Sequence, residues 1–138
     1  MNFHAWGNGS WVVLFSHPKD FTPVCTTEIA EVCRLKNEFE KRKVKVIGIS
    51  TDSKREHKSW IKDIEATQKV KMNFPVLSDI DRKVSEMYGM LQPAETRQLV
   101  LIRSVYIIDP NRKIRLISNY PPSTGRHFDE VLRVIDSL

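Results

Sequence analysis

The sequence of 138 residues contains two cysteines, Cys25 and Cys33, and the first stands where a thiol can be reactive. Cys25 follows an apolar run and a loop with two prolines, at the point where a helix is expected to begin. Free N–H groups and the helix dipole favour an anion there, which is the position of many reactive thiolates. A small buried apolar residue is the competing interpretation, and position alone leaves both open.

A nucleophilic thiol needs more than ionisation to break a peroxide bond. A free thiol is already several per cent thiolate near neutral pH, so full ionisation gains only about tenfold, or about 1.4 kcal/mol of barrier. Cleavage of the O–O bond also builds charge on the departing oxygen, which pre-placed donors must stabilise. Peroxide chemistry at Cys25 therefore requires a nearby hydroxyl and a cation from a distant part of the chain.

The residue types that this chemistry needs are present. Thr22 supplies a hydroxyl three residues before Cys25, and Pro18 belongs to the same loop. Arg103 opens an expected strand and can bring a cation, although a surface salt bridge is an alternative role for an arginine there.

Cys33 is expected to be a core residue. Eight residues of helix separate the Cα atoms of Cys25 and Cys33 by about 12 Å, beyond the disulfide limit of about 7 Å. The two thiols therefore cannot bridge within a folded chain. Two unpaired cysteines fit a reducing compartment, and we expect a cytoplasmic protein.

The elements that position these residues form an alternating pattern. It predicts strands, helices and a hairpin closed by Asp-Pro-Asn-Arg at 109–112, and hence a mixed sheet flanked by helices. The stretch from Met90 to Ile102 is expected to be an irregular loop. Strands are predicted at 10–16, 44–50, 74–77, 104–108 and 113–119, and helices at about 26–41, 53–68, 79–88 and 126–138.

Composition favours one globular domain over residues 1–138. Hydrophobic residues make up 41% and charged residues 28%, enough for one core and a solvated surface. The net charge of +5 is spread along the chain, so we expect no nucleic-acid partner. No apolar run or basic leader indicates a membrane span or a secretory signal, and we expect no membrane partner.

The segment SHPKDFTPVCTTE resembles the peroxiredoxin signature, which is Pro, three residues, Thr, two residues, Cys, at Pro18, Thr22 and Cys25. The longer string is similar to the one-cysteine, peroxiredoxin-6-like subgroup. Arg103 in IRSVYIIDP, Arg126 in YPPSTGRHFDE and the terminal VLRVIDSL match that subgroup in the same order. The resemblance covers nearly the whole chain, which looks shortened at both ends, and it implies an α/β, thioredoxin-like fold.

The resemblance implies a thiol-specific peroxidase acting on hydrogen peroxide and organic hydroperoxides through a Cys25 sulfenic acid. It gives Thr22 hydrogen bonds to the peroxide and the thiolate. Pro18 shields the thiolate from water, and Arg103 holds the thiolate and stabilises the transition state. It implies a homodimer or higher homo-oligomer, and we expect no cofactor or metal.

Three further residues are candidates for support around the site. His17 is expected to hydrogen-bond the peroxide or to orient the loop. Glu28 is expected to complement the helix dipole or to pair with Arg126. Because Cys33 cannot act as a resolving thiol, the reductant must be external: a small thiol, a thioredoxin-like protein or a cysteine on a further segment.

Two other functions remain open at this stage. A peroxiredoxin fold can serve as a redox sensor or chaperone without turnover. A phospholipase-type hydrolase would use Ser10 with His4, but Asn111 stands at the acidic partner's place and Asp109 lies two residues away. A thioredoxin-type disulfide reductase is disfavoured, because the sequence has no Cys-x-x-Cys pair.

Overall fold

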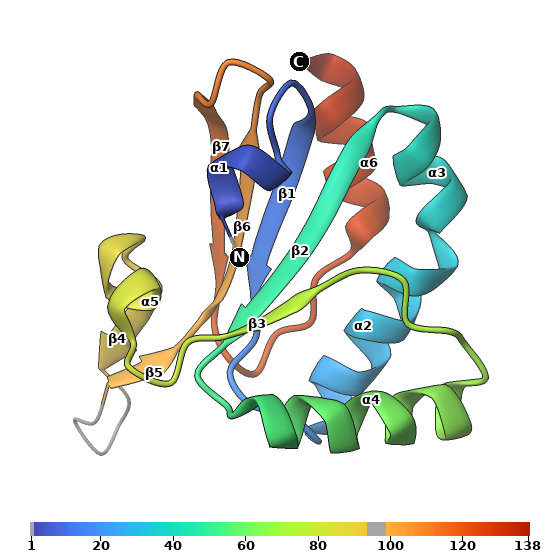
Figure 1. Cartoon of the computed structure of the whole chain (residues 1–138), viewed down its shortest axis with the longest axis vertical. Coiled ribbons are helices and arrows are strands. Elements are labelled where there is room, and N and C mark those ends of the chain that lie inside the picture. Colours follow the sequence, from blue (N-terminus) through green and yellow to red (C-terminus); the bar gives the residue numbers. More distant parts are fainter. Residues whose placement is uncertain (1, 94–98) are drawn as a thin grey trace.

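A mixed five-stranded sheet organises the protein, in a computed structural model that describes residues 2–93 and 99–138 (Figure 1). The strand order is β3-β2-β1-β6-β7, and β4 pairs with β5 in a separate small sheet. Strands β1, β2 and β3 are parallel, whereas β6 and β7 each run antiparallel to the preceding neighbour in the sheet. The predicted mixed sheet is therefore confirmed. The strands are β1 Trp11–Ser16, β2 Val44–Ser50, β3 Val76–Ser78, β4 Leu91–Pro93, β5 Leu99–Leu101, β6 Arg103–Ile108 and β7 Ile114–Tyr120.

The described helices cover both faces of this sheet. None of them, within 2–93 and 99–138, is long and apolar enough to cross a bilayer. They are α1 Phe3–Trp6, α2 Pro23–Arg34, α3 Lys36–Lys41, α4 Lys54–Gln68, α5 Lys83–Met87 and α6 Phe128–Ser137.

Strand β1 lies at the centre of the sheet and carries the chain toward the candidate site. Five of its six residues are buried, as expected for an apolar strand covered on both faces. It pairs in parallel with β2, with Leu14 opposite Ile47, and antiparallel with β6, with Leu14 opposite Tyr106. The loop that follows β1 therefore emerges beside the N-terminal end of β6, where Arg103 stands.

Two apolar cores fill the space between the sheet and its covering layers. On one face, Val13 and Phe15 of β1 pack with buried residues of α2, α3, α4 and α6. On the other face, Val12 and Leu14 pack with the β4–β5 region and with partly buried side chains of α1 and α5. Figure 1 shows α6 and α1 on opposite sides of the sheet. Cys25 belongs to the first core, and alternation along β1 directs Phe15 toward it.

The helix expected at about 26–41 is two helices. Helix α2 begins at Pro23, with Thr22 as its N-cap, and a break at Leu35 separates it from α3. Proline is favoured in the first turn of a helix, because its missing N–H would have no partner there. The earlier start places Cys25 inside the first turn of α2 instead of just before the helix.

The fold differs from the sequence prediction at two further places. The loop expected from Met90 to Ile102 contains strands β4 and β5, which pair antiparallel with Leu91 opposite Leu101; its residues 94–98 lie outside the described residues. Burial of Leu101 against the second core stabilises this pairing. Pro93 lies at the end of its strand, where a residue without a backbone N–H donor is tolerated. Helix α1 was not predicted, because four residues are too few to give a periodic signal.

Candidate active site

Cys25 occupies the first turn of α2, and its side chain is fully buried. The Nη1 of Arg103 donates to its Sγ at 3.2 Å. Arg103 comes from the start of β6, seventy-eight positions further along the chain. The structure thus brings together the thiol and the distant cation that peroxide chemistry requires.

Arg103 is fixed by two other acceptors. Its Nη1 also donates to Oε1 of Glu28 at 2.6 Å, and its Nε donates to the carbonyl of Pro122 at 2.7 Å. Arg103 is only 2% exposed, so its guanidinium group has little access to water. A buried arginine with fixed partners can present a donor to Cys25 without reorganisation, which is the property that electrostatic catalysis needs.

Glu28 links Arg103 to a second buried arginine. Its carboxylate accepts from the backbone N, the Nε and the Nη2 of Arg126 at 2.6, 2.8 and 3.0 Å. The guanidinium group of Arg126 lies 5.3 Å from the ring centroid of Phe15 and 5.5 Å from that of Phe128. The expected pairing of Glu28 with Arg126 is therefore present. The two arginines leave this buried group with one positive charge in excess, beside the sulfur of Cys25.

The loop before Cys25 carries Pro18 and Thr22, both half-buried. The hydroxyl of Thr22 donates to the carbonyl of Lys19 at 3.0 Å, and no hydrogen bond within 2–93 and 99–138 joins that hydroxyl to Cys25. Its oxygen lone pairs remain available to accept. Phe21 takes a left-handed φ of 66° with its ring 51% exposed, a costly conformation for an aromatic residue that neighbouring contacts must hold.

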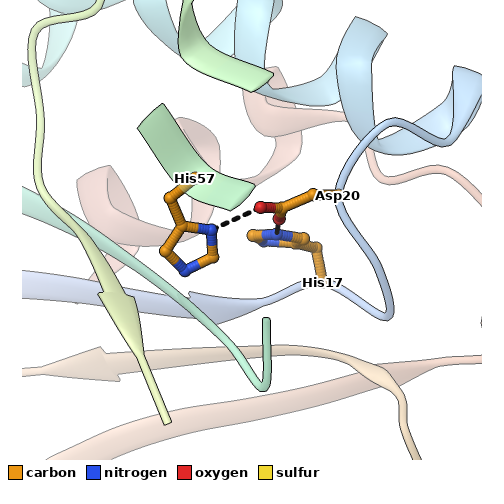
Figure 2. A group of neighbouring side chains, drawn as sticks. All are labelled: His17, Asp20 and His57. Carbon is orange, nitrogen blue, oxygen red and sulfur yellow. Dashed lines mark hydrogen bonds and ion pairs between the residues drawn. The ribbon is translucent and has the colours of Figure 1, made fainter. Parts of the chain in front are cut away.

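Asp20, the residue before Phe21, lies between two histidines (Figure 2). Its Oδ1 is 2.7 Å from Nε2 of His17, and its Oδ2 is 2.5 Å from Nδ1 of His57. The other ring nitrogen of His57 is 3.0 Å from the carbonyl of Leu77, and the backbone N of Asp20 donates to Asp52 at 2.8 Å. All three members of the chain His17–Asp20–His57 are buried.

The charges of this chain follow from burial and hydrogen bonding. Burial lowers the pKa of His17, outweighing the opposing effect of Asp20. Burial also opposes charge on Asp20 and on His57, but the hydrogen bonds of Asp20 with His17 and His57, and the attraction between opposite charges, outweigh it. The pKa of Asp20 falls to about 2, and the pKa of His57 is raised.

The donor set of this chain is one that transition metals use, and the ligand atoms lie within 4.8 Å of one another. However, the two short N···O distances each correspond to a hydrogen bond, and a metal ion would have to displace both bridging protons. The two distances therefore indicate hydrogen bonds among His17, Asp20 and His57.

Cys33 lies in the same helix but in a different environment. It is 6% exposed, and its Sγ contacts the thioether sulfur of Met72 at 3.7 Å. Burial raises the pKa of its thiol. Neither cysteine is in a disulfide, as the helix geometry predicted.

The residues of the alternative hydrolase site share a small cavity. Ser10, His4 and Asp109 all line a space of about 90 Å³ between α1 and the β6–β7 turn. The Oδ1 of Asp109 accepts from the backbone N atoms of Asn111 and Lys113, both at 2.9 Å. No hydrogen bond connects Ser10, His4 and Asp109 in the described part of the chain, so the geometry gives this alternative no relay.

Sequence reasoning therefore located the thiol and its arginine–glutamate partners but not Asp20 and His57. Asp20 lies inside the signature segment, and His57 stands on the apolar face of α4 with Trp60 and Ile64. A titratable residue on such a face indicates a buried polar partner, and this signal could have directed attention to His57.

A comparison with protein-family models gives a match over most of the chain. The model described as the AhpC/TSA family matches residues 2–117. The chain belongs to the AhpC/TSA family. Its expected membership of the peroxiredoxins is thereby confirmed.

Relatives of this family match the whole chain. A 1-Cys peroxiredoxin of Dictyostelium discoideum is 47% identical over 138 residues, which are 100% of this chain and 57% of the relative. The structure of a cysteine-to-serine mutant of the Peroxiredoxin 6 of Arenicola marina superposes with a TM-score of 0.93 at 44% identity, covering 99% of this chain and 64% of that one. The yeast mitochondrial 1-Cys peroxiredoxin gives a TM-score of 0.90 at 47% identity, covering 99% of this chain and 67% of that one.

These relatives confirm the thioredoxin-like fold and the likeness to one-cysteine members of the family. The chain spans a little over half of the Dictyostelium relative.

Proposed function

We propose that the chain is a thiol-dependent peroxidase in which Cys25 is the nucleophile. The single observation that carries the proposal is the hydrogen bond from the buried Arg103 to Sγ of Cys25. Family membership supports it, because the relatives are named peroxiredoxins.

In the proposed reaction the Cys25 thiolate attacks one oxygen of a hydroperoxide. An S–O bond forms as the O–O bond breaks, so that Cys25 is oxidised by two electrons to a sulfenic acid. The departing oxygen takes up one proton and leaves as water or an alcohol. Arg103 contributes by holding a donor where negative charge develops, and Glu28 and Arg126 keep that donor in place.

The loop residues have supporting roles in this proposal. Thr22 offers oxygen lone pairs to the incoming hydroperoxide, Pro18 limits the access of water, and His17 is a further contact for the peroxide. Because Cys25 is buried, entry of the peroxide requires transient opening of the loop or of the first turn of α2. The left-handed Phe21 is a point where such opening releases strain.

The sulfenic acid is then reduced by an external thiol. One thiol forms a mixed disulfide with Cys25 and releases water, and a second thiol restores Cys25 and leaves as the disulfide. The structural study of the yeast relative describes resolution of its thiol by glutathione and thioredoxin systems, which supports an external reductant of this class here. The cytoplasm, with its pool of reduced thiols, is the compartment that we propose for this chemistry.

The test is steady-state consumption of hydrogen peroxide by the purified protein with excess dithiothreitol. The wild type and Cys33→Ser should both turn over, and Cys25→Ser should fall to the uncatalysed rate. Activity that survives in Cys25→Ser would overturn the assignment. Oxidation of Cys25 by one equivalent of peroxide without sustained turnover would favour the sensor alternative.

A further inference from the structure

The hydrogen-bond partners of the chain His17–Asp20–His57 determine which ring nitrogens carry protons, and those of His57 are the clearest (Figure 2). The carbonyl of Leu77 can only accept, so the Nε2 of His57 carries a proton. The Nδ1 of His57 faces an oxygen of Asp20 at 2.5 Å, and an ionised carboxylate also only accepts. His57 therefore donates from both nitrogens and is an imidazolium paired with the Asp20 carboxylate.

The same argument fixes the tautomer of His17. Its Nε2 faces the other oxygen of Asp20 at 2.7 Å, and a lone pair there would point at a carboxylate lone pair. The proton of a neutral His17 is therefore on Nε2, which leaves Nδ1 as an acceptor. That Nδ1 is the one buried side-chain nitrogen or oxygen without a hydrogen-bond partner among the described residues.

His17 is linked to the first turn of α2 through Trp60. Its backbone N continues the β1–β2 ladder by donating to Ile49, so its side chain faces the same side of the sheet as Phe15. Its ring centroid is 4.9 Å from that of Trp60, whose Nε1 donates to Thr26, the residue after Cys25.

We propose that His57 and Asp20 are positioning residues that hold His17 neutral, with its buried Nδ1 kept as a hydrogen-bond acceptor for the O–H of the incoming hydroperoxide. This inference rests on the proposed peroxidase function and adds His57 and Asp20 to its machinery. Asp20 fixes the ring orientation of His17, and His57 cancels the charge of Asp20. Without that cancellation, the lone carboxylate would draw a second proton onto His17, and Nδ1 would become a donor.

Other charged groups near these three side chains favour the same distribution of charge, with His57 positive and His17 neutral. Arg126, two residues before α6, opposes a positive charge on His17, as does His57 from α4. Asp52, from the loop after β2, favours a positive charge on His57, and burial raises the pKa of Asp52 itself. The positive charge is thus stabilised at His57 and disfavoured at His17.

The first test reads the protons directly and does not depend on activity. Long-range ¹H–¹⁵N correlation spectra of the imidazole rings are recorded on the full chain near pH 6.5, with His57→Gln and His127→Gln for assignment. We expect an imidazolium pattern for His57 and, for His17, a protonated Nε2 with an unprotonated Nδ1. A neutral His57 or a proton on Nδ1 of His17 would overturn the proposal.

The second test measures the second-order rate of Cys25 oxidation by stoichiometric peroxide from about pH 5 to about pH 8, the range of histidine titration. His57→Gln should lose roughly tenfold at the acidic end, the usual effect of one lost substrate hydrogen bond, and recover toward the alkaline end. The exposed His127→Gln should follow the wild type.

The double variant Asp20→Asn/His57→Gln separates charge from structure. It removes both charges, so His17 should again remain neutral and the acidic end of the profile should return toward the wild type. A loss in His57→Gln that is equal at every pH, or no recovery in the double variant, would contradict the proposal. So would tight binding of Zn²⁺ to the wild type that Asp20→Asn abolishes, because that outcome assigns the chain to a metal.

Failure of this inference is distinguishable from failure of the peroxidase proposal. If peroxide does not oxidise Cys25 in the wild type, the peroxidase proposal fails while the ring spectra still report the protons. If Cys25 is oxidised normally but the spectra or the profiles disagree, only the role of His57 and Asp20 fails.

Discussion

The two cysteines of helix α2 have the same side chain, the same backbone conformation and nearly the same burial, but very different neighbours. Cys25, in the first turn, accepts a hydrogen bond from Arg103, which is held by Glu28. Cys33, in the last turns, contacts the thioether of Met72, and burial raises the pKa of its thiol. The contrast teaches that two buried thiols of one helix differ in what surrounds them: Cys25 faces a buried cation at a helix start, whereas Cys33 faces apolar neighbours.

Removing the cation should abolish most of this contrast. Arg103→Ala is expected to slow peroxide oxidation of Cys25 by about 10²- to 10³-fold, the usual cost of losing a donor aimed at developing charge. Stopped-flow fluorescence or competition kinetics measures this rate. Arg103→Lys should recover only part of it, since an ammonium cannot reach Glu28, Pro122 and Sγ with the same fixed geometry.

The matched control for Arg103 is Arg133→Ala, an exposed arginine of α6 paired with Glu130. It should leave the oxidation rate of Cys25 unchanged. A comparable loss in both variants would mean that the effect of Arg103 is not local to the thiol.

Glu28 tests whether the arginines are held by one buried carboxylate. Glu28→Gln leaves two buried guanidinium groups without a counter-charge and should lower the free energy of unfolding by about 3 kcal/mol. Denaturant titration measures the change. Glu130→Gln, on the exposed surface of α6, should have little effect. Equal stability of Glu28→Gln and the wild type would argue against the buried network.

The pH dependence of alkylation tests the other half of the comparison, the suppressed reactivity of Cys33. In Cys25→Ser, iodoacetamide labelling of native Cys33 should be slow at neutral pH. Because burial raises its pKa, the rate should keep rising beyond the pH of about 8.5 at which free thiols are half ionised. Mass spectrometry follows the labelling, and the same variant in urea is the control. A plateau below that pH would show that burial does not raise the pKa of the Cys33 thiol.

Much of this arrangement was predictable because strong local patterns matched tertiary structure. The apolar runs of β1 and β2, the amphipathic face of α4 and the turn at 109–112 all gave the expected elements. Other features depend on contacts that local patterns do not encode. The break at Leu35 and the pairing of Leu91 with Leu101 arise from packing against the rest of the chain.

In the candidate site, too, some features were predictable from local sequence and others depend on tertiary contacts. The spacing of Pro18, Thr22 and Cys25 is a sequence signal, whereas the approach of Asp20 to His57 needs a loop and a helix 37 positions apart to meet. No local pattern in a single sequence reveals that contact. The hydroxyl of Thr22, directed to the carbonyl of Lys19, likewise depends on the local path of the loop.

The most direct test of Cys25 as the reactive thiol is the intact mass of the full chain after one equivalent of hydrogen peroxide in the presence of dimedone. A single dimedone adduct, mapped by peptide analysis to Cys25, is the predicted result, with Cys33 unmodified. An adduct on Cys33, or an immediate disulfide between Cys25 and Cys33, would contradict the assignment.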